Sequence, residues 1–283
     1  MDGILLIDKE PNFTSFDVCN ITRKVFQTKK VGHSGTLDPF ATGLLVITIG
    51  KATKINQFLE NLDKEYIATL MLGKTTSTLD TEGEIIQEEE INEFSKDELL
   101  NAFNSLIGDI EQVPPMFSAL KVNGKRLYEY AREGKEVERK VRNIKIYSLE
   151  LIEYNHPYIS FKVKCSKGTY VRTLGQQIAE KFNTIGYLTS LRRVSVGRFN
   201  VANANTITEL KENSNLRLLS SLEGLKHYKM IMVNEKLKND IMNGKKLFFK
   251  DEEDLLAITE NKEALAILEK GEDGRYRVKR GLW

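Results

Sequence analysis

A single aspartate in a glycine-rich segment is the strongest candidate for a reactive group in this chain. Asp38 lies within the segment 32–43, GHSGTLDPFATG, directly before a proline. Glycines let a backbone approach a ligand closely, so this carboxylate can be held against a bound substrate. An ionised carboxylate acts as a nucleophile or as a general base. An Asx turn before the proline is the structural alternative for Asp38.

Two further segments carry polar groups that such a reaction can use. In the segment 165–172, CSKGTYVR, Arg172 lies where a strand turns into a helix, and its guanidinium is suited to pairing with a carboxylate. In Lys64-Glu65-Tyr66 a tyrosine lies at the start of another strand. Taken alone, Arg172 is also typical of a surface cation and Tyr66 of an aromatic residue in the core.

The spacing of other residues does not support the common nucleotide, metal or hydrolase sites. Gly43 to Lys51 is too long for a Walker A loop, and no G-x-G-x-x-G motif follows a strand. A Ser-His-Asp hydrolase would need a G-x-S-x-G motif, which the sequence lacks. Cys19, Cys165 and the three histidines are scattered and have no zinc-ligand spacing. We therefore expect no metal and no cofactor.

Charge is distributed unevenly along a chain whose composition is that of a globular protein. The 283 residues carry a formal net charge of only +2. The stretch 80–98 has nine acidic residues against one lysine, and we interpret it as a solvated face. The stretch 121–145 has nine basic residues against four acidic ones, interleaved with tyrosines. Cations with aromatic residues suit phosphates and stacked bases, although a helix with paired charges has a similar pattern.

The sequence contains no export or membrane signal. Residues 1–8 lack a basic region, and their apolar core is too short for a signal peptide. No window approaches the ~18 consecutive apolar residues that a membrane span needs. Two isolated cysteines suit a reducing compartment. We expect a cytoplasmic protein that does not associate with membranes.

Strands and helices alternate irregularly along the first 220 residues or so. Strands are predicted at 4–7, 44–49, 66–72 and 156–166, and 31–43 is predicted to be a loop. Helices are predicted after Thr14-Ser15, after the capping box Ser95-x-x-Glu98 with a stop at Gly108, and after Thr173. The lack of a regular strand–helix period favours an α+β fold.

The pattern changes after residue 222 to short strand-like pieces separated by turn residues. These pieces are at 230–233, 246–249, 255–259, 264–269 and 275–278. Their spacing indicates a small β-rich domain. We therefore predict a large domain over residues 1–229 and a small one over residues 230–283.

The segments around Asp38, Tyr66 and Arg172 occur together with several longer motifs. These motifs are GILLIDK at 3–9, GDIEQVPPMFSALK at 108–121 and LRR at 191–193. On this ordered set, the chain resembles the TruB family of tRNA pseudouridine synthases over nearly its whole length. The resemblance implies that the enzyme isomerises uridine 55 in the T loop of tRNA to pseudouridine.

The resemblance also implies a fold and a partner. It predicts a mixed, mainly antiparallel central sheet flanked by helices, an RNA-gripping insertion at about 114–145 and a C-terminal PUA domain at 230–283. The implied partner is the T-arm stem-loop of tRNA. We expect a monomer that needs no obligate protein partner.

The functional residues of the family transfer to matching positions of this chain. Asp38 matches the catalytic aspartate, which acts at C1′ or C6 or removes the proton at C2′. Arg172 matches the arginine that pairs with it and opposes its protonation on burial. Tyr66 matches the tyrosine that stacks on the target base, and His33 the histidine that fills the space left by the flipped base. The other predicted substrate-binding residues are Lys9, Leu191, Lys125, Arg126 and Arg132.

The turn 8–12 departs from the usual family pattern. Glu10 replaces the usual proline after the lysine, and Asn12 stands where glycine is usual. Asparagine tolerates the left-handed conformation, so we expect the turn to be kept.

Two alternative functions remain open from the sequence. One is an RNA-binding or tRNA-folding protein without catalysis, which the intact set of Asp38, Tyr66 and Arg172 disfavours. The other is a guide-RNA-dependent pseudouridine synthase, which the insertion disfavours. A T-arm substrate distinguishes the three.

Overall fold

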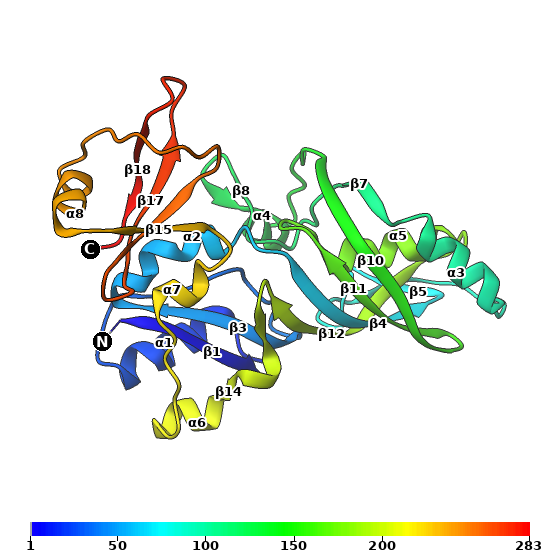
Figure 1. The fold of residues 1–283 in the computed structure, drawn as a ribbon. Coiled ribbons are helices and arrows are strands. Elements are labelled where there is room, and N and C mark those ends of the chain that lie inside the picture. Colours follow the sequence, from blue (N-terminus) through cyan, green and yellow to red (C-terminus); the bar gives the residue numbers. More distant parts are fainter. Residues whose placement is uncertain (1) are drawn as a thin grey trace.

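A mixed sheet of ten strands runs through the larger part of the computed structural model, which describes residues 2–283 (Figure 1). Its strand order is β14-β1-β3-β12-β4-β11-β10-β7, with β2 beside β3 and β13 beside β12. β1 pairs in parallel with β14 and β3 with β12, whereas the other pairs are antiparallel. The predicted α+β fold with a mainly antiparallel sheet is confirmed. The strands are β1 Gly3–Lys9, β2 Val31–His33, β3 Thr42–Ile49, β4 Lys64–Leu72, β7 Gly108–Gln112, β10 Arg142–Asn155, β11 Tyr158–Cys165, β12 Gly186–Val196, β13 Phe199–Asn200 and β14 Asn205–Thr206.

The two faces of this sheet are covered differently, because successive side chains of a strand point to opposite faces. Along β1, Leu5 and Ile7 join a core with α1 Ser15–Val25, α3 Lys96–Asn104, α5 Val171–Glu180 and α6 Ile207–Glu212. Ile4 and Leu6 join a second core with η1 Gly50–Ile55 and α2 Asn56–Leu59. The remaining small elements of this part are β5 Lys74–Thr76, β6 Ile85–Glu88, η2 Val201–Asn203 and α7 Ser221–Gly224.

A separate four-stranded sheet forms the C-terminal part (Figure 1). Its strands are β15 Lys229–Val233, β16 Leu255–Thr259, β17 Ala264–Lys270 and β18 Tyr276–Gly281, and α8 Glu235–Met242 lies beside them. Val233, Ile241 and Tyr276 belong to a core within this part. Leu256 and Ile267 instead join the second core of the large sheet. The small sheet therefore has its own core and also packs on the large one.

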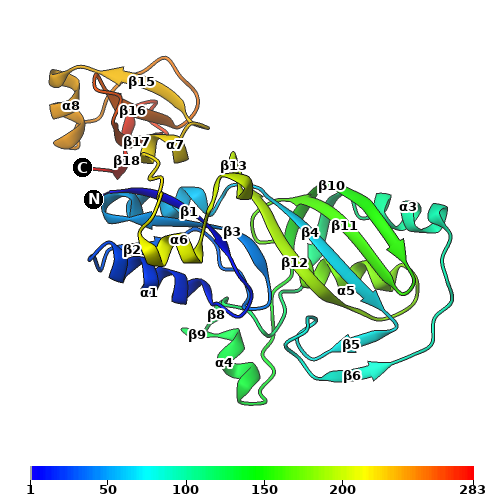
Figure 2. The same cartoon turned by 90° about the horizontal axis from the view of Figure 1, so that it is seen from below.

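A segment between β7 and β10 stands apart from both sheets (Figure 2). It holds β8 Lys121–Val122, β9 Lys125–Arg126 and α4 Leu127–Arg132, within the insertion predicted from the sequence. None of the helices in residues 2–283 is long and apolar enough to cross a membrane.

Several local predictions need correction. Residues 31–33, predicted as loop, form β2, which pairs with β3. α3 begins after the capping box at Ser95 but ends at Asn104, and Gly108 instead begins β7 with a φ of 111°. α5 begins at Val171. The predicted strand at 246–249 is wrong, since only a single bridge pairs Leu247 with β18, and α8 was not predicted.

Candidate active site

A cavity of about 390 Å³ lies where β3 changes its neighbour. β1 pairs along the whole of β3, so β2 and β12 share its other edge. β2 occupies residues 47–49 of that edge and β12 occupies residues 42 and 43. The connection 34–41 between β2 and β3 therefore spans the gap that is left between β2 and β12 on this edge of β3. Among the residues that line the cavity are His33, Asp38, Tyr66, Ser118, Arg172 and Leu191.

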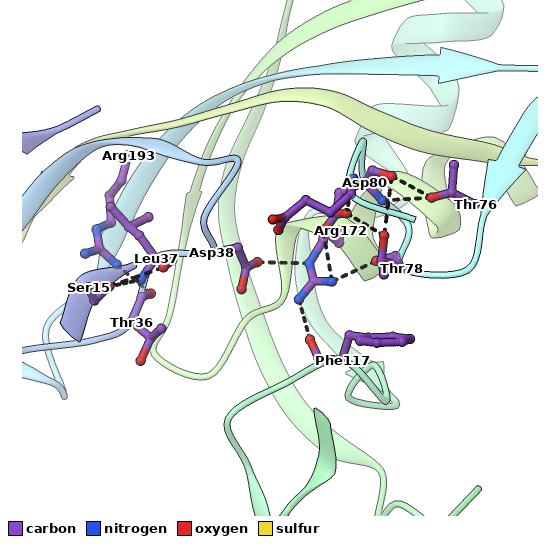
Figure 3. Close-up of polar contacts among 11 residues, drawn as sticks. Ser15, Thr36, Leu37, Asp38, Thr76, Thr78, Asp80, Phe117, Arg172 and Arg193 are labelled. Atoms are coloured by element: carbon purple, nitrogen blue, oxygen red, sulfur yellow. Dashed lines mark hydrogen bonds and ion pairs between the residues drawn. The ribbon is translucent and has the colours of Figure 1, made fainter. Parts of the chain in front are cut away.

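Buried side chains from α1 and β12 fix the backbone of the loop that carries Asp38 (Figure 3). The Ser15 hydroxyl accepts from the Leu37 N–H at 2.9 Å and donates to the Leu37 carbonyl at 3.2 Å. Arg193 is 1% exposed and donates to carbonyls earlier in the loop. Its acceptors are Gly35 at 3.1 Å, Thr36 at 3.3 Å and, in β3, Leu44 at 2.8 Å. The aspartate thus stands on an immobilised loop.

Lys9 supports the same loop and does not face the cavity. Its ammonium donates to the carbonyls of Glu10 at 3.0 Å, Phe13 at 2.7 Å and Pro39 at 3.2 Å. Because the Lys9 side chain is 0% exposed, it offers no surface to a substrate, and the predicted binding role is corrected to one of positioning. Burial lowers the pKa of Lys9 to about 8. Asn12 keeps the altered turn with a φ of 65°, as expected.

Arg172 is the centre of the polar network in the cavity (Figure 3). Its side chain is 4% exposed, and every guanidinium nitrogen has an acceptor. Nε lies 3.0 Å from Asp38 Oδ2, and Nη1 lies 3.1 Å from Asp80 Oδ2 and donates to the Thr78 carbonyl at 2.7 Å. Nη2 donates to the Phe117 carbonyl at 2.6 Å. One side chain therefore joins the aspartate loop, the β5–β6 connection and the insertion.

Asp80 is a member of this network that the sequence did not reveal. It lies within the acidic stretch interpreted as a solvated face, yet it is 1% exposed. The Thr78 hydroxyl and the Glu82 N–H, the latter at 3.0 Å, donate to its Oδ1. Thr76 donates to the Asp80 carbonyl at 2.6 Å and accepts from its N–H at 3.1 Å. The alternating pattern Thr76-x-Thr78-x-Asp80 is the sequence signal that could have indicated a capped, buried carboxylate.

Burial sets the protonation behaviour of the residues in the cavity. It raises the pKa of Asp38, an effect that the positive charge of Arg172 opposes and the negative charge of Asp80 reinforces. It also raises the pKa of Tyr66, so the phenol is held neutral. Burial and the charge of Arg193 lower the pKa of His33, which favours a neutral imidazole. The site therefore combines the Asp38 carboxylate with neutral aromatic surfaces.

The predicted RNA-binding cations lie on β9 and α4, outside the cavity. Two guanidinium groups lie near the Tyr128 ring, Arg126 at 5.8 Å and Arg132 at 5.4 Å from its centroid. The Lys125 ammonium lies 4.7 Å from the Tyr130 centroid and pairs with an acidic residue of the same segment. Both interpretations of the sequence, interleaved aromatics and paired charges, thus describe this surface.

Comparison with known proteins identifies one family. Residues 23–171 match the family model for TruB family pseudouridylate synthase (N terminal domain). A tRNA pseudouridine synthase B of Clostridium tetani is 42% identical over 248 residues, which cover 87% of this chain and 86% of that protein. Proteins of the same name from Clostridium perfringens and Haemophilus influenzae are 46% and 45% identical, over 88% and 80% of this chain and 85% and 72% of their own lengths.

Solved structures share the fold at lower identity. A chain in a Cbf5-Nop10-Gar1 complex has a TM-score of 0.75 and 21% identity, covering 99% of this chain and 85% of that chain. A chain in an H/ACA RNP bound to a substrate RNA containing 2′-deoxyuridine has a TM-score of 0.73 and 19% identity, with coverage of 99% and 85%. At these identities the likeness shows the fold alone.

Proposed function

The chain belongs to the TruB family of pseudouridylate synthases and is a tRNA pseudouridine synthase, and from this premise we propose that it modifies uridine 55 of the T loop with Asp38 as its catalytic residue. The supporting observation is the cavity in which Asp38, Tyr66 and Arg172 meet His33 and Leu191. The reaction breaks the C1′–N1 bond, rotates the uracil and joins C5 to C1′. Nothing is oxidised and no group is lost, so one ionised carboxylate suffices.

Asp38 acts beside the glycosidic bond of the bound uridine. It attacks C1′ or C6, or it removes the proton at C2′, and each of these atoms lies at or next to the C1′–N1 bond. The role requires the ionised carboxylate, which burial disfavours. Arg172 counters this with a charge 3.0 Å away and holds the carboxylate in one orientation. Tyr66 supplies the surface on which the uracil stacks.

The target uridine has to leave the loop stack before it can enter the cavity. His33, as a neutral imidazole at the rim of the Asp38 loop, fills the space that the base leaves. The cations of the insertion hold phosphates of the T arm. Residues 230–283 act as a PUA domain, a role that fits a small sheet with its own core. One chain supplies all these surfaces, so it acts as a monomer without an obligate protein partner.

Incubation with an unmodified T-arm stem-loop, followed by mapping of pseudouridine, tests this function. We expect pseudouridine at position 55 with the natural chain and none with Asp38→Asn, whose Kd for the RNA should stay within about threefold. Asp97→Asn, the same change at an exposed position in α3, is the matched control and should retain full activity.

Each alternative predicts a different result in this assay. Turnover by Asp38→Asn would exclude this carboxylate as the catalytic group. Tight binding of the T arm without any product from the natural chain would favour the non-catalytic alternative. Product that forms only when a guide RNA is added would favour the guide-dependent one.

A further inference from the structure

Ser118 has a buried hydroxyl without a partner at the wall of the cavity. The residue is 5% exposed, and its Oγ makes no hydrogen bond to any part of residues 2–283. Its backbone is fully used, because its N–H donates to the Met116 carbonyl at 3.0 Å and its carbonyl accepts from the Tyr128 N–H at 3.1 Å. Buried hydroxyls are normally satisfied, and leaving one unpaired is unfavourable. A bound ligand would supply the missing partner.

Arg172 connects Asp38 to Phe117, the residue directly before Ser118 (Figure 3). The Phe117 carbonyl, directly before Ser118, accepts from Nη2 of Arg172 at 2.6 Å, and Asp38 pairs with Nε at 3.0 Å. Nε and Nη2 form one edge of the planar guanidinium. Asp38 and the peptide between Phe117 and Ser118 are therefore neighbours on that edge. Ser118 therefore belongs to the aspartate side of the cavity.

The ribose of the target nucleotide has to lie close to the aspartate side, because Asp38 acts at C1′ or C2′ of the ribose or at C6, which is two bonds from C1′. We propose that the Ser118 hydroxyl hydrogen-bonds the 2′-hydroxyl of that ribose and thereby selects RNA over DNA at the reacting nucleotide; this rests on the proposed function. A serine hydroxyl and a ribose 2′-hydroxyl each donate and accept. The serine side chain has a single rotatable Cα–Cβ bond with three staggered positions, so its Oγ can be reoriented toward a ligand.

Two other buried hydroxyls of residues 2–283 also lack partners, but their position differs from that of Ser118. Ser34 and Thr173 are buried and unpaired, but neither lines the cavity. An unpaired hydroxyl is therefore not by itself a sign of substrate contact. Thr173→Val removes such a hydroxyl at constant shape and serves as the matched control for Ser118→Ala.

A double-mutant cycle between protein and RNA tests the contact. We would measure kcat/KM and Kd for the natural chain, Ser118→Ala and Thr173→Val, on a T-arm stem-loop and on the same RNA with one 2′-deoxyuridine at the target. Ser118→Ala should lower kcat/KM by about three- to tenfold on the ribose substrate and have no effect on the deoxy substrate. Any effect of the deoxy substitution on the chemistry itself is shared by all the proteins and cancels in the cycle.

Other outcomes overturn the assignment. Equal losses on both substrates would mean that Ser118 contacts the uracil or a phosphate, and no loss on the ribose substrate would mean that it contacts nothing. A structural role predicts a lower melting temperature for Ser118→Ala, whereas removal of an unpaired hydroxyl should leave it unchanged or raise it. If the natural chain forms no pseudouridine, the proposed function fails, and the cycle in Kd still tests the contact.

Discussion

Replacing Arg172 by lysine and by glutamine should separate the two effects of its guanidinium. The group is 4% exposed and reaches acceptors in Asp38, Asp80, Thr78 and Phe117 at 2.6 to 3.1 Å. Lysine keeps the charge, but its single nitrogen does not span acceptors on both edges of a guanidinium. Breaking a buried ion pair costs about 3–5 kcal/mol of stability, and we expect losses of that order in both variants. Because Asp38 is no longer oriented, kcat should fall by about 10²-fold or more.

The pH dependence distinguishes charge from geometry in these two variants. Activity requires ionised Asp38, so kcat/KM falls as the pH falls through its pKa. Arg172 is the largest contribution that opposes the rise in this pKa on burial. Removing the charge in Arg172→Gln therefore raises the pKa of Asp38 further and moves the acid limb to higher pH, whereas Arg172→Lys moves it less. The measurements are thermal unfolding and kcat/KM on a T-arm stem-loop over about pH 5 to 9.

An exposed arginine provides the control for these variants. Arg198 pairs with Glu223 at 3.3 Å and its side chain is 50% exposed, so Arg198→Gln should change neither stability nor the acid limb appreciably. An acid limb that is the same in Arg172→Gln and the natural chain would refute the view that Arg172 keeps Asp38 ionised.

Three further predictions follow from burial, backbone conformation and charge. Burial raises the pKa of Asp38 in the folded chain, and such a carboxyl makes the fold less stable as the pH rises through that pKa. Asp38→Asn should therefore raise the melting temperature at neutral pH, and raise it less near pH 4. A lower melting temperature at neutral pH would contradict this. Gly43 has a φ of 99°, and a Cβ at this position would lie 2.3 Å from the Arg193 carbonyl oxygen. Gly43→Ala should therefore lower the free energy of unfolding, measured by chemical denaturation, by about 2 kcal/mol or more. Gly134→Ala, where a Cβ meets no obstruction, should lower it less. Replacing the insertion cations by alanine should weaken T-arm binding and reduce the slope of log K against log salt by about 0.7 to 0.9 per lost contact, and an unchanged slope would argue against phosphate contacts. These cations are Lys125, Arg126 and Arg132.

Elements defined by local sequence patterns were predicted well. The strand predicted at 156–166 is β11, in which Ile159, Phe161 and Val163 are buried and alternate with more exposed residues. The capping box at Ser95 begins α3, where its hydroxyl accepts from the Glu98 N–H at 3.3 Å. Both signals are complete within a few residues of the chain, so no distant contact is needed to realise them.

Predictions failed where burial depends on distant partners. Asp80 and Lys9 are charged residues that the sequence alone leads one to place at the surface or facing a ligand. Asp80 is buried because it pairs with Arg172, 92 positions later, and Lys9 is buried because its ammonium donates a hydrogen bond to the Pro39 carbonyl, 30 positions later. α8 was missed for a different reason, since its signal is local: the Asn234 side chain accepts from the Leu237 N–H at 2.9 Å.

The approach of Asp38 to Arg172 could be predicted only through the family resemblance. Neither residue has a local pattern that indicates the other, and they meet because the loop between β2 and β3 and the start of α5 border the same gap in the sheet. That gap arises from a change of strand partner along β3, which depends on the whole sheet. The spacing of residues along the chain therefore does not predict this gap.

The network around Arg172 favours orientation over electrostatic stabilisation of Asp38. A guanidinium that paired with Asp38 alone would keep this carboxylate more strongly ionised. Asp80 instead shares the same charge and raises the pKa of Asp38. It also occupies the far edge of the guanidinium, so that the near edge is presented to Asp38 and the Phe117 carbonyl in one fixed plane. Because the rate depends so steeply on the distance from carboxylate to substrate, a fixed orientation of Asp38 outweighs the rise in its pKa.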